Sequence, residues 1–185
     1  NSLEELKKMK YITGSTVCLE ENLFLKHKNL EFYATCYDGD KLIGKPVVQI
    51  LKKNTFWSGS YTSNSKWNNY LIQLTEQIIK EFKPCGYGGF DFCIADNKTI
   101  YVLDVNTGRF TGSHVPILYM QNNDLYGHYV YLSQTHSSSF HNIKKELDSL
   151  NINYEILAYS QTILNIIIYD FSFKKVQKDF KKIKN

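Results

Sequence analysis

The sequence lacks the usual signatures of membrane, secreted and zinc-binding proteins. Its strongly apolar stretch 163–169 has the length of a strand and is too short to cross a bilayer. The sequence does not begin with the basic, apolar and small-residue regions of a signal peptide, so no secretory leader is expected. The four cysteines (Cys18, Cys36, Cys85 and Cys93) show no CxxC spacing and no nearby histidines, which argues against zinc and for buried, reduced thiols. These absences predict a cytoplasmic protein.

The length and composition indicate a globular protein with a core of its own. The 185 residues suffice for one sizeable domain, and an aromatic content of 15% favours a packed globule with strands. The formal net charge is +4, but much of the positive excess lies near the C-terminal end. Because the rest of the chain is close to neutral, neither nucleic acid nor a membrane is expected as a partner.

A β-hairpin is expected in the stretch 86–114. An apolar run with one acid (90–94) is followed by a turn at 95–98 and a returning strand over 99–105. Side chains alternate along a strand, so Asp104 and Asn106 share one face, and Asp91 can lie opposite Asp104. Two adjacent carboxylates repel each other unless a cation lies between them, which favours a Mg²⁺ site. The alternative is that both acids are the polar positions of a half-buried hairpin.

The loop after this hairpin carries further polar candidates. Arg109 follows within the glycine-containing stretch 107–113, where its guanidinium could bind a phosphate or a carboxylate. His114 could contact a phosphate or a substrate carboxylate, or it could be a loop histidine that bonds to the backbone. Residues 111–115 are the candidates for contact with an acceptor substrate.

The motifs Gly89-Phe90-Asp91-Phe92 and Val102-Leu103-Asp104-Val105-Asn106-Thr107 resemble the metal-binding end of the ATP-grasp superfamily. In that superfamily an acid on one strand is followed by Glu-x-Asn on the next. The resemblance implies that Asp91, Asp104 and Asn106 are Mg²⁺ ligands and that Arg109 is a catalytic phosphate contact. The sequence departs from the pattern in two ways, since Asp104 replaces the usual glutamate and one extra residue separates Asn106 from Arg109.

The same resemblance assigns nucleotide-binding roles to residues nearer the start of the chain. The segment 16–23 is similar to the ATP-grasp hinge, in which Glu20, Glu21, Asn22 and Leu23 would hold the adenine. Glu31 matches the glutamate that binds the ribose hydroxyls. The alternative for the first segment is an edge strand with solvated acids. Lys52 and Lys53 are the nearest candidates for a basic phosphate contact, although solvated strand ends are the simpler explanation.

Periodicity outlines the remaining elements. A short helix is expected at 2–10, a hairpin at 30–37 and 42–51, a surface loop at 52–61 and a helix at 66–82. The helix would pack a stripe of apolar residues against the core, namely Trp67, Tyr70, Leu71, Leu74, Ile78 and Phe82.

The C-terminal part is expected to alternate between helices and strands. Helices are expected to start at 115 and to span 140–150 and 173–183, with strands at 126–132, 154–157 and 163–169 and a polar loop at 135–139. The last helix carries six lysines and would dock its apolar face onto the domain. The fold class is therefore α+β, an antiparallel sheet with packed helices, as in the large ATP-grasp subdomain. Residues 1–120 would form the ATP-grasp lobe and 121–185 an α/β extension packed on it.

The resemblance implies an ATP-dependent ligase that uses ATP and Mg²⁺. Such an enzyme activates a carboxylate as an acyl phosphate, which an amine then attacks, so small-molecule carboxylates and amines are the expected substrates. A complete enzyme also has an upstream lobe with phosphate-binding lysines, and the first residue is Asn1, so we expect this chain to be a C-terminal half that is inactive alone. A homodimer is possible. The alternatives are a non-catalytic ATP-grasp-like module for binding or assembly, and a nucleic-acid-binding domain.

Overall fold

The computed structural model describes residues 22–52, 56–120, 125–133, 140–160 and 163–184. The expected helix at 2–10, most of the segment 16–23 and the polar loop at 135–139 lie outside these residues. The strands are β1 Leu30–Asp38, β2 Lys41–Lys52, β3 Phe56–Thr62, β4 Tyr87–Ala95, β5 Ile100–Thr107, β6 Tyr126–Ser133, β7 Tyr154–Tyr159 and β8 Ile163–Asp170. The helices are α2 Leu23–Lys26, α3 Asn68–Phe82, the 3₁₀ turn η1 Gly112–His114, α4 Val115–Met120, α5 Phe140–Ser149 and α6 Phe173–Lys184.

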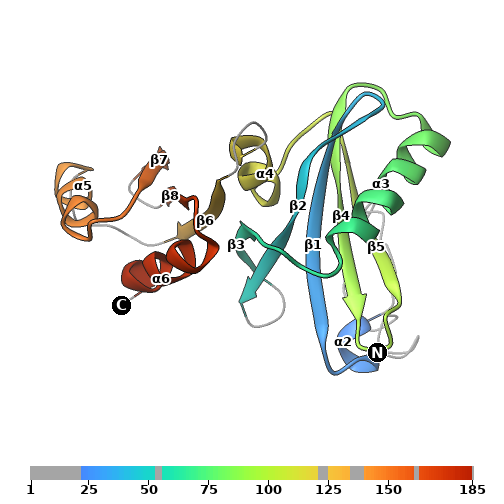
Figure 1. Cartoon of the computed structure of the whole chain (residues 1–185), viewed down its shortest axis with the longest axis horizontal. Helices are drawn as coiled ribbons and strands as arrows, with labels where there is room; N and C mark the ends of the chain where they lie inside the picture. Colours follow the sequence, from blue (N-terminus) through green and yellow to red (C-terminus); the bar gives the residue numbers. More distant parts are fainter. Residues whose placement is uncertain (1–21, 53–55, 121–124, 134–139, 161–162, 185) are drawn as a thin grey trace, which may run out of the picture.

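The strands form an antiparallel sheet in the order β5-β4-β1-β2-β3-β6-β8-β7 (Figure 1). The sheet and its packed helices confirm the expected α+β class. The sheet runs without interruption from the hairpin β4–β5 to the C-terminal strands, because β3 pairs with β6. A division into 1–120 and 121–185 stays a prediction.

Helix α3 covers one face of the central strands. The core between them contains Tyr33 and Tyr37 of β1, Phe90, Phe92 and Ile94 of β4, and Leu71 and Ile79 of α3. Each fully buried apolar side chain of this size contributes about 1.5–3 kcal/mol to folding. On the opposite face, Ile117 of α4 packs against Ala34, Cys36 and Val47. The strand expected at 30–37 is thereby confirmed, and both of its faces are covered, one by α3 and the other by α4.

The C-terminal helices pack on β6 and β8. Ile143 and Leu147 of α5 share a core with Val130, Leu164, Ile166 and Ile168, and Phe180 and Ile183 of α6 pack against it. The apolar face of α6 is therefore docked, as expected. No helix in the described part of the chain has the length and apolar character that a transmembrane span requires.

Two expectations about the central part were wrong. The surface loop expected at 52–61 contains strand β3, which pairs with both β2 and β6. Its glycine has a packing reason, because a β-carbon at Gly59 would lie 2.3 Å from the carbonyl oxygen of Tyr129. In α3, Tyr70 and Phe82 are 55% and 80% exposed, and the fully buried positions are Leu71, Thr75 and Ile79.

Candidate functional site

The hairpin β4–β5 brings Asp91 and Asp104 together as directly opposite residues. Asn106 lies opposite Gly89, two positions further along the same face. A bulge follows the acidic pair, since Phe92 pairs with Val102 and leaves Leu103 as an extra residue in β5. The structure thus confirms that Asp91, Asp104 and Asn106 converge on one face of the sheet.

Asp91 is the more buried of the two acids, with 17% of its side chain exposed. Gln49 of β2 donates its Nε2 to Oδ1 of Asp91 at 2.7 Å, and Asn106 donates its Nδ2 to Oδ2 at 3.4 Å. Desolvation, followed by the charge of Asp104, raises the pKa of Asp91 to about 6. The hydrogen bonds from Gln49, Asn106 and Ser113 lower this pKa and so offset part of the effect.

Arg109 is the only arginine in the chain, and it lies beside this pair. Its side chain is exposed, and its Nε donates to Oδ1 of Asn106 at 3.2 Å. One edge of the guanidinium is thus held against the hairpin. The extra residue before Arg109 does not carry it away from the site.

His114 is fully buried beneath the acidic pair. The backbone N–H of Thr111 donates to its Nδ1 at 2.8 Å, so in the neutral ring the proton lies on Nε2. That Nε2 has no hydrogen-bond partner in the described part of the structure and lies 3.9 Å from Oδ1 of Asp91. Burial lowers the pKa of His114 to about 4, which keeps the ring neutral near pH 7. His114 therefore presents a fixed N–H toward the acids.

The donors at this site fit a hard divalent cation. Two carboxylates and an amide supply oxygen ligands only, and a cation between the acids would offset the repulsion between their charges. Oδ1 of Asn106 has two lone pairs, so it can accept from Arg109 and coordinate a cation at the same time. The described residues contain no group of three or more histidines, cysteines, aspartates or glutamates arranged to hold a metal. A cation at this site would need further ligands such as water molecules.

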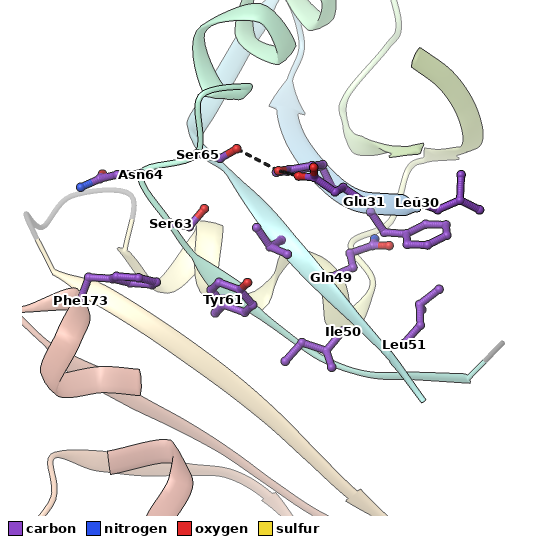
Figure 2. Close-up of a pocket in the computed structure, with 13 residues that line it drawn as sticks. Leu30, Glu31, Gln49, Ile50, Leu51, Tyr61, Ser63, Asn64, Ser65 and Phe173 are labelled. Atoms are coloured by element: carbon purple, nitrogen blue, oxygen red, sulfur yellow. Dashed lines mark hydrogen bonds between the residues drawn. The ribbon is translucent and has the colours of Figure 1, made fainter. Parts of the chain in front are cut away.

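Glu31 lies on the other face of the sheet from the acidic pair. Glu31 shares its face of β1 with Tyr33, whose ring is in the core beneath α3. Asp91 lies between Phe90 and Phe92 of that same core, so its side chain points to the opposite face. The hydroxyl of Tyr33 donates to Oε2 of Glu31 at 2.7 Å and lies 2.8 Å from Oγ of Ser65. Glu31 lines a groove of about 590 Å³ with Tyr61, Asn64 and Phe173 (Figure 2). The structure does not bring Glu31 together with the acidic pair.

The predicted hinge residues Glu20 and Glu21 lie outside the described residues, as does Lys53. Asn22 and Leu23 lie at the start of α2, where Oδ1 of Asn22 accepts the backbone N–H of Phe24 at 3.1 Å. Lys52, the nearest described candidate for a basic phosphate contact, ends β2 in an exposed position.

Sequence reasoning missed Gln49, and it included Ser113 only within the acceptor-contact stretch 111–115. Gln49 is found only through the tertiary fold, since 42 residues separate it from its partner Asp91. Ser113 lies in η1, directly before His114, and its backbone oxygen accepts the hydroxyl of Ser60 at 3.0 Å. Gln49 lies two residues after the apolar Val47 and so shares its face of β2, which was a signal that its side chain faces a covered part of the sheet.

The chain has the ATP-grasp fold, which it shares with part of each of several solved structures. N5-carboxyaminoimidazole synthase from Aspergillus clavatus, solved with ADP and 5-aminoimidazole ribonucleotide, superposes with a TM-score of 0.60 at 12% identity, over 85% of this chain and 50% of that one. N5-carboxyaminoimidazole ribonucleotide synthetase from Thermotoga maritima gives 0.62 at 8% identity, over 84% and 51%.

A biotin carboxylase domain has the same fold. The domain from the 2-oxoglutarate carboxylase of Hydrogenobacter thermophilus, solved with MgADP, ADP and bicarbonate, gives a TM-score of 0.58 at 10% identity, over 84% of this chain and 45% of that one. This chain thus spans about half the length of these structures. No family model matches the sequence, and no curated protein matches it either. At these identities the likeness establishes the fold.

Proposed function

We propose that this chain is the C-terminal, metal- and nucleotide-binding portion of an ATP-dependent ligase that activates a carboxylate for attack by an amine. The observation that carries the proposal is the direct pairing of Asp91 with Asp104, on the face that also holds Asn106 and Arg109. The shared fold supports it, and the solved structures include complexes with ADP, ATP and MgADP.

Each residue of the site would have its own role in phosphoryl transfer. Mg²⁺ bound by Asp91, Asp104 and Asn106 would offset the charge of the nucleotide phosphates. Arg109, which is exposed and anchored through its Nε, would direct its remaining N–H groups to the transferring phosphoryl group or to the substrate carboxylate. The fixed Nε2–H of His114 points into the same site and can donate to an oxygen there. Glu31 lies on the opposite face, so its proposed ribose contact is not part of this arrangement.

The proposal is tested by calorimetric titration of Mg²⁺-ATP into the protein at its full natural length. An Asp91→Asn, Asp104→Asn double variant removes the paired charges while keeping the shape of both side chains. We expect its affinity for Mg²⁺-ATP to fall at least about tenfold, a loss of about 1.4 kcal/mol. The control is Asp148→Asn, at an exposed position on α5.

The outcomes separate the two functional classes. Loss of binding in the double variant alone, followed by ATP-dependent coupling of a carboxylate to an amine, supports the ligase. Equal binding by wild type and double variant, or no binding by either, contradicts the metal-nucleotide site and leaves a non-catalytic scaffold with the ATP-grasp fold.

A further inference from the structure

Three side chains connect α2 to the tip of the hairpin β4–β5. His27, which follows α2, places its Nδ1 2.9 Å from Oδ1 of Asp96 and its Nε2 3.2 Å from the hydroxyl of Tyr101. The backbone N–H of Lys28 donates to the second oxygen of Asp96 at 3.2 Å. His27 is only 8% exposed, and its partners are 69 and 74 residues away in the sequence. We call His27, Asp96 and Tyr101 the tip cluster.

The chemistry of the tip cluster fixes the direction of each hydrogen bond. A carboxylate can only accept, so Nδ1 of His27 donates to Asp96, and in the neutral ring Nε2 accepts from the hydroxyl of Tyr101. The bonds from His27 and Lys28 lower the pKa of Asp96, which keeps it ionised. All three groups thus have matched partners, and each bond depends on the others.

The tip cluster ties the end of a short helix to the sheet. It has four residues, too few to be stable on its own. None of them is buried, and Leu25 is 79% exposed. Besides the tip cluster, the ring of Phe24 contacts that of Phe32, with 5.9 Å between the ring centroids. The tip cluster is therefore one restraint on the position of α2.

The tip cluster and the acidic pair lie along one face of the same hairpin. Tyr101 is opposite Cys93, and Cys93 is two residues along β4 from Asp91, so the side chains of all three are on the same face. Phe32, the ring that α2 contacts, is also opposite Cys93. From Asp91 to the end of β4 at Ala95 is four residues, or about 13 Å of strand. An extended nucleotide with its phosphates at the acids would reach toward α2.

We propose that the tip cluster is a positioning element, which fixes α2 at a set distance from the acidic pair. Helix α2 then forms a preformed contact surface for the nucleoside end of the bound nucleotide. This inference rests on the proposed function. His27 and Asp96 act through α2 and are not catalytic residues. The cluster contributes to binding of the nucleoside and not to binding of the Mg²⁺-phosphate group.

Two probes distinguish these contributions in the full-length protein. Mg²⁺-ATP reaches both ends of the site, whereas Mg²⁺-tripolyphosphate lacks the nucleoside and reaches the acids alone. We expect His27→Ala and Asp96→Ala each to weaken Mg²⁺-ATP about tenfold, and the double variant to weaken it no more than either single change. Affinity for Mg²⁺-tripolyphosphate should stay within twofold of wild type in all three. His27→Asn, whose amide N–H can replace that of Nδ1, should restore most of the affinity for Mg²⁺-ATP.

The alternative outcomes are each decisive. An equal loss for both probes would show that the tip cluster merely maintains the fold, and no loss for either would show that α2 does not meet the nucleoside. Each of these results overturns the inference while the proposed function stands, because wild type still binds Mg²⁺-ATP through its acids. If wild type binds neither probe, the proposed function fails and the inference fails with it.

Discussion

Gly89 lies directly against the ring of His114. A β-carbon at position 89 would be 2.3 Å from Nε2 of His114 and 2.5 Å from the carbonyl oxygen of Thr35, both closer than van der Waals contact allows. The missing side chain therefore makes room for the buried imidazole beneath the acidic pair. Glycine at this position has a packing role and no unusual backbone angle.

Gly89→Ala is expected to destabilise the protein by about 2–3 kcal/mol, since neither the imidazole nor the strand carbonyl can move away freely. Urea denaturation followed by circular dichroism measures the change. Thr107→Ala, at an exposed position of β5, is the control and should change the stability by less than about 0.5 kcal/mol. A Gly89→Ala protein as stable as the control would show that His114 is not tightly packed against β4.

Asp91→Asn is expected to stabilise the metal-free protein at neutral pH. The pKa of Asp91 is raised from 3.8 to about 6, so the folded protein binds this proton more tightly than the unfolded chain does. The free energy of unfolding therefore falls as the pH rises from about 4 to about 6, and the loss persists above pH 6. An asparagine can still accept from Gln49 but carries no charge, and the gain should be about 2 kcal/mol at pH 7.5 and close to zero at pH 4.

Thermal and urea denaturation of both proteins across pH 4–8, without divalent cations, measures this gain. Asp148→Asn is a control of opposite sign, because hydrogen bonds from Tyr154 and Lys144 lower the pKa of Asp148 and the folded state favours its charge. A stability gain from Asp91→Asn that did not vary with pH would contradict the raised pKa.

The buried carboxylate of Asp179 on α6 depends on two lysines. Asp179 is 2% exposed, with Nζ of Lys175 at 3.7 Å and Nζ of Lys182 at 2.7 Å. Both lysines are partly exposed, so replacing either one alone with methionine should cost less than about 1 kcal/mol. Replacing both leaves a buried charge with neither cation, and we expect a cost of about 2–3 kcal/mol.

Denaturation of the two single variants and the double variant gives the coupling between the lysines. Lys174→Met with Lys178→Met, at exposed positions on the same helix, is the matched control. A double variant at Lys175 and Lys182 whose loss equals the sum of two small single losses would show that Asp179 is well solvated after all.

The parts of the fold that local pattern determines could be predicted from the sequence. The β4–β5 hairpin follows from strand alternation on either side of a tight turn. The turn alone would pair Asp91 with Leu103, and the bulge at Leu103 is what places Asp104 opposite Asp91. The closeness of the two acids was therefore accessible to sequence reasoning, whereas the bulge that aligns them was not. Gln49, the partner of Asp91, was not accessible either, because the two strands concerned are separated by β1.

Strand β3 and the buried face of α3 were predicted wrongly because contacts with residues distant in the sequence determine them. Strand β3 contains glycine and serines that are typical of a loop, yet Gly59 is needed where the backbone of Tyr129 approaches closely. In α3 the buried stripe includes Thr75, whose hydroxyl donates to that of Thr35 at 3.1 Å. A polar residue with a distant partner could not be recognised as core, and the exposure of the large aromatic Tyr70 on the same helix could not be read from its size.

The pairing between β3 and β6, which joins the two parts of the sheet, is short. Only three residue pairs join these strands, whereas nine join β1 to β4. Helix α4 lies across this pairing, since it contacts β2 and β3 on one side and β6 on the other. The helix continues directly from the turn that ends in His114. The C-terminal strands and the buried imidazole beneath the acids are therefore connected through one short helix as well as through three residue pairs of the sheet.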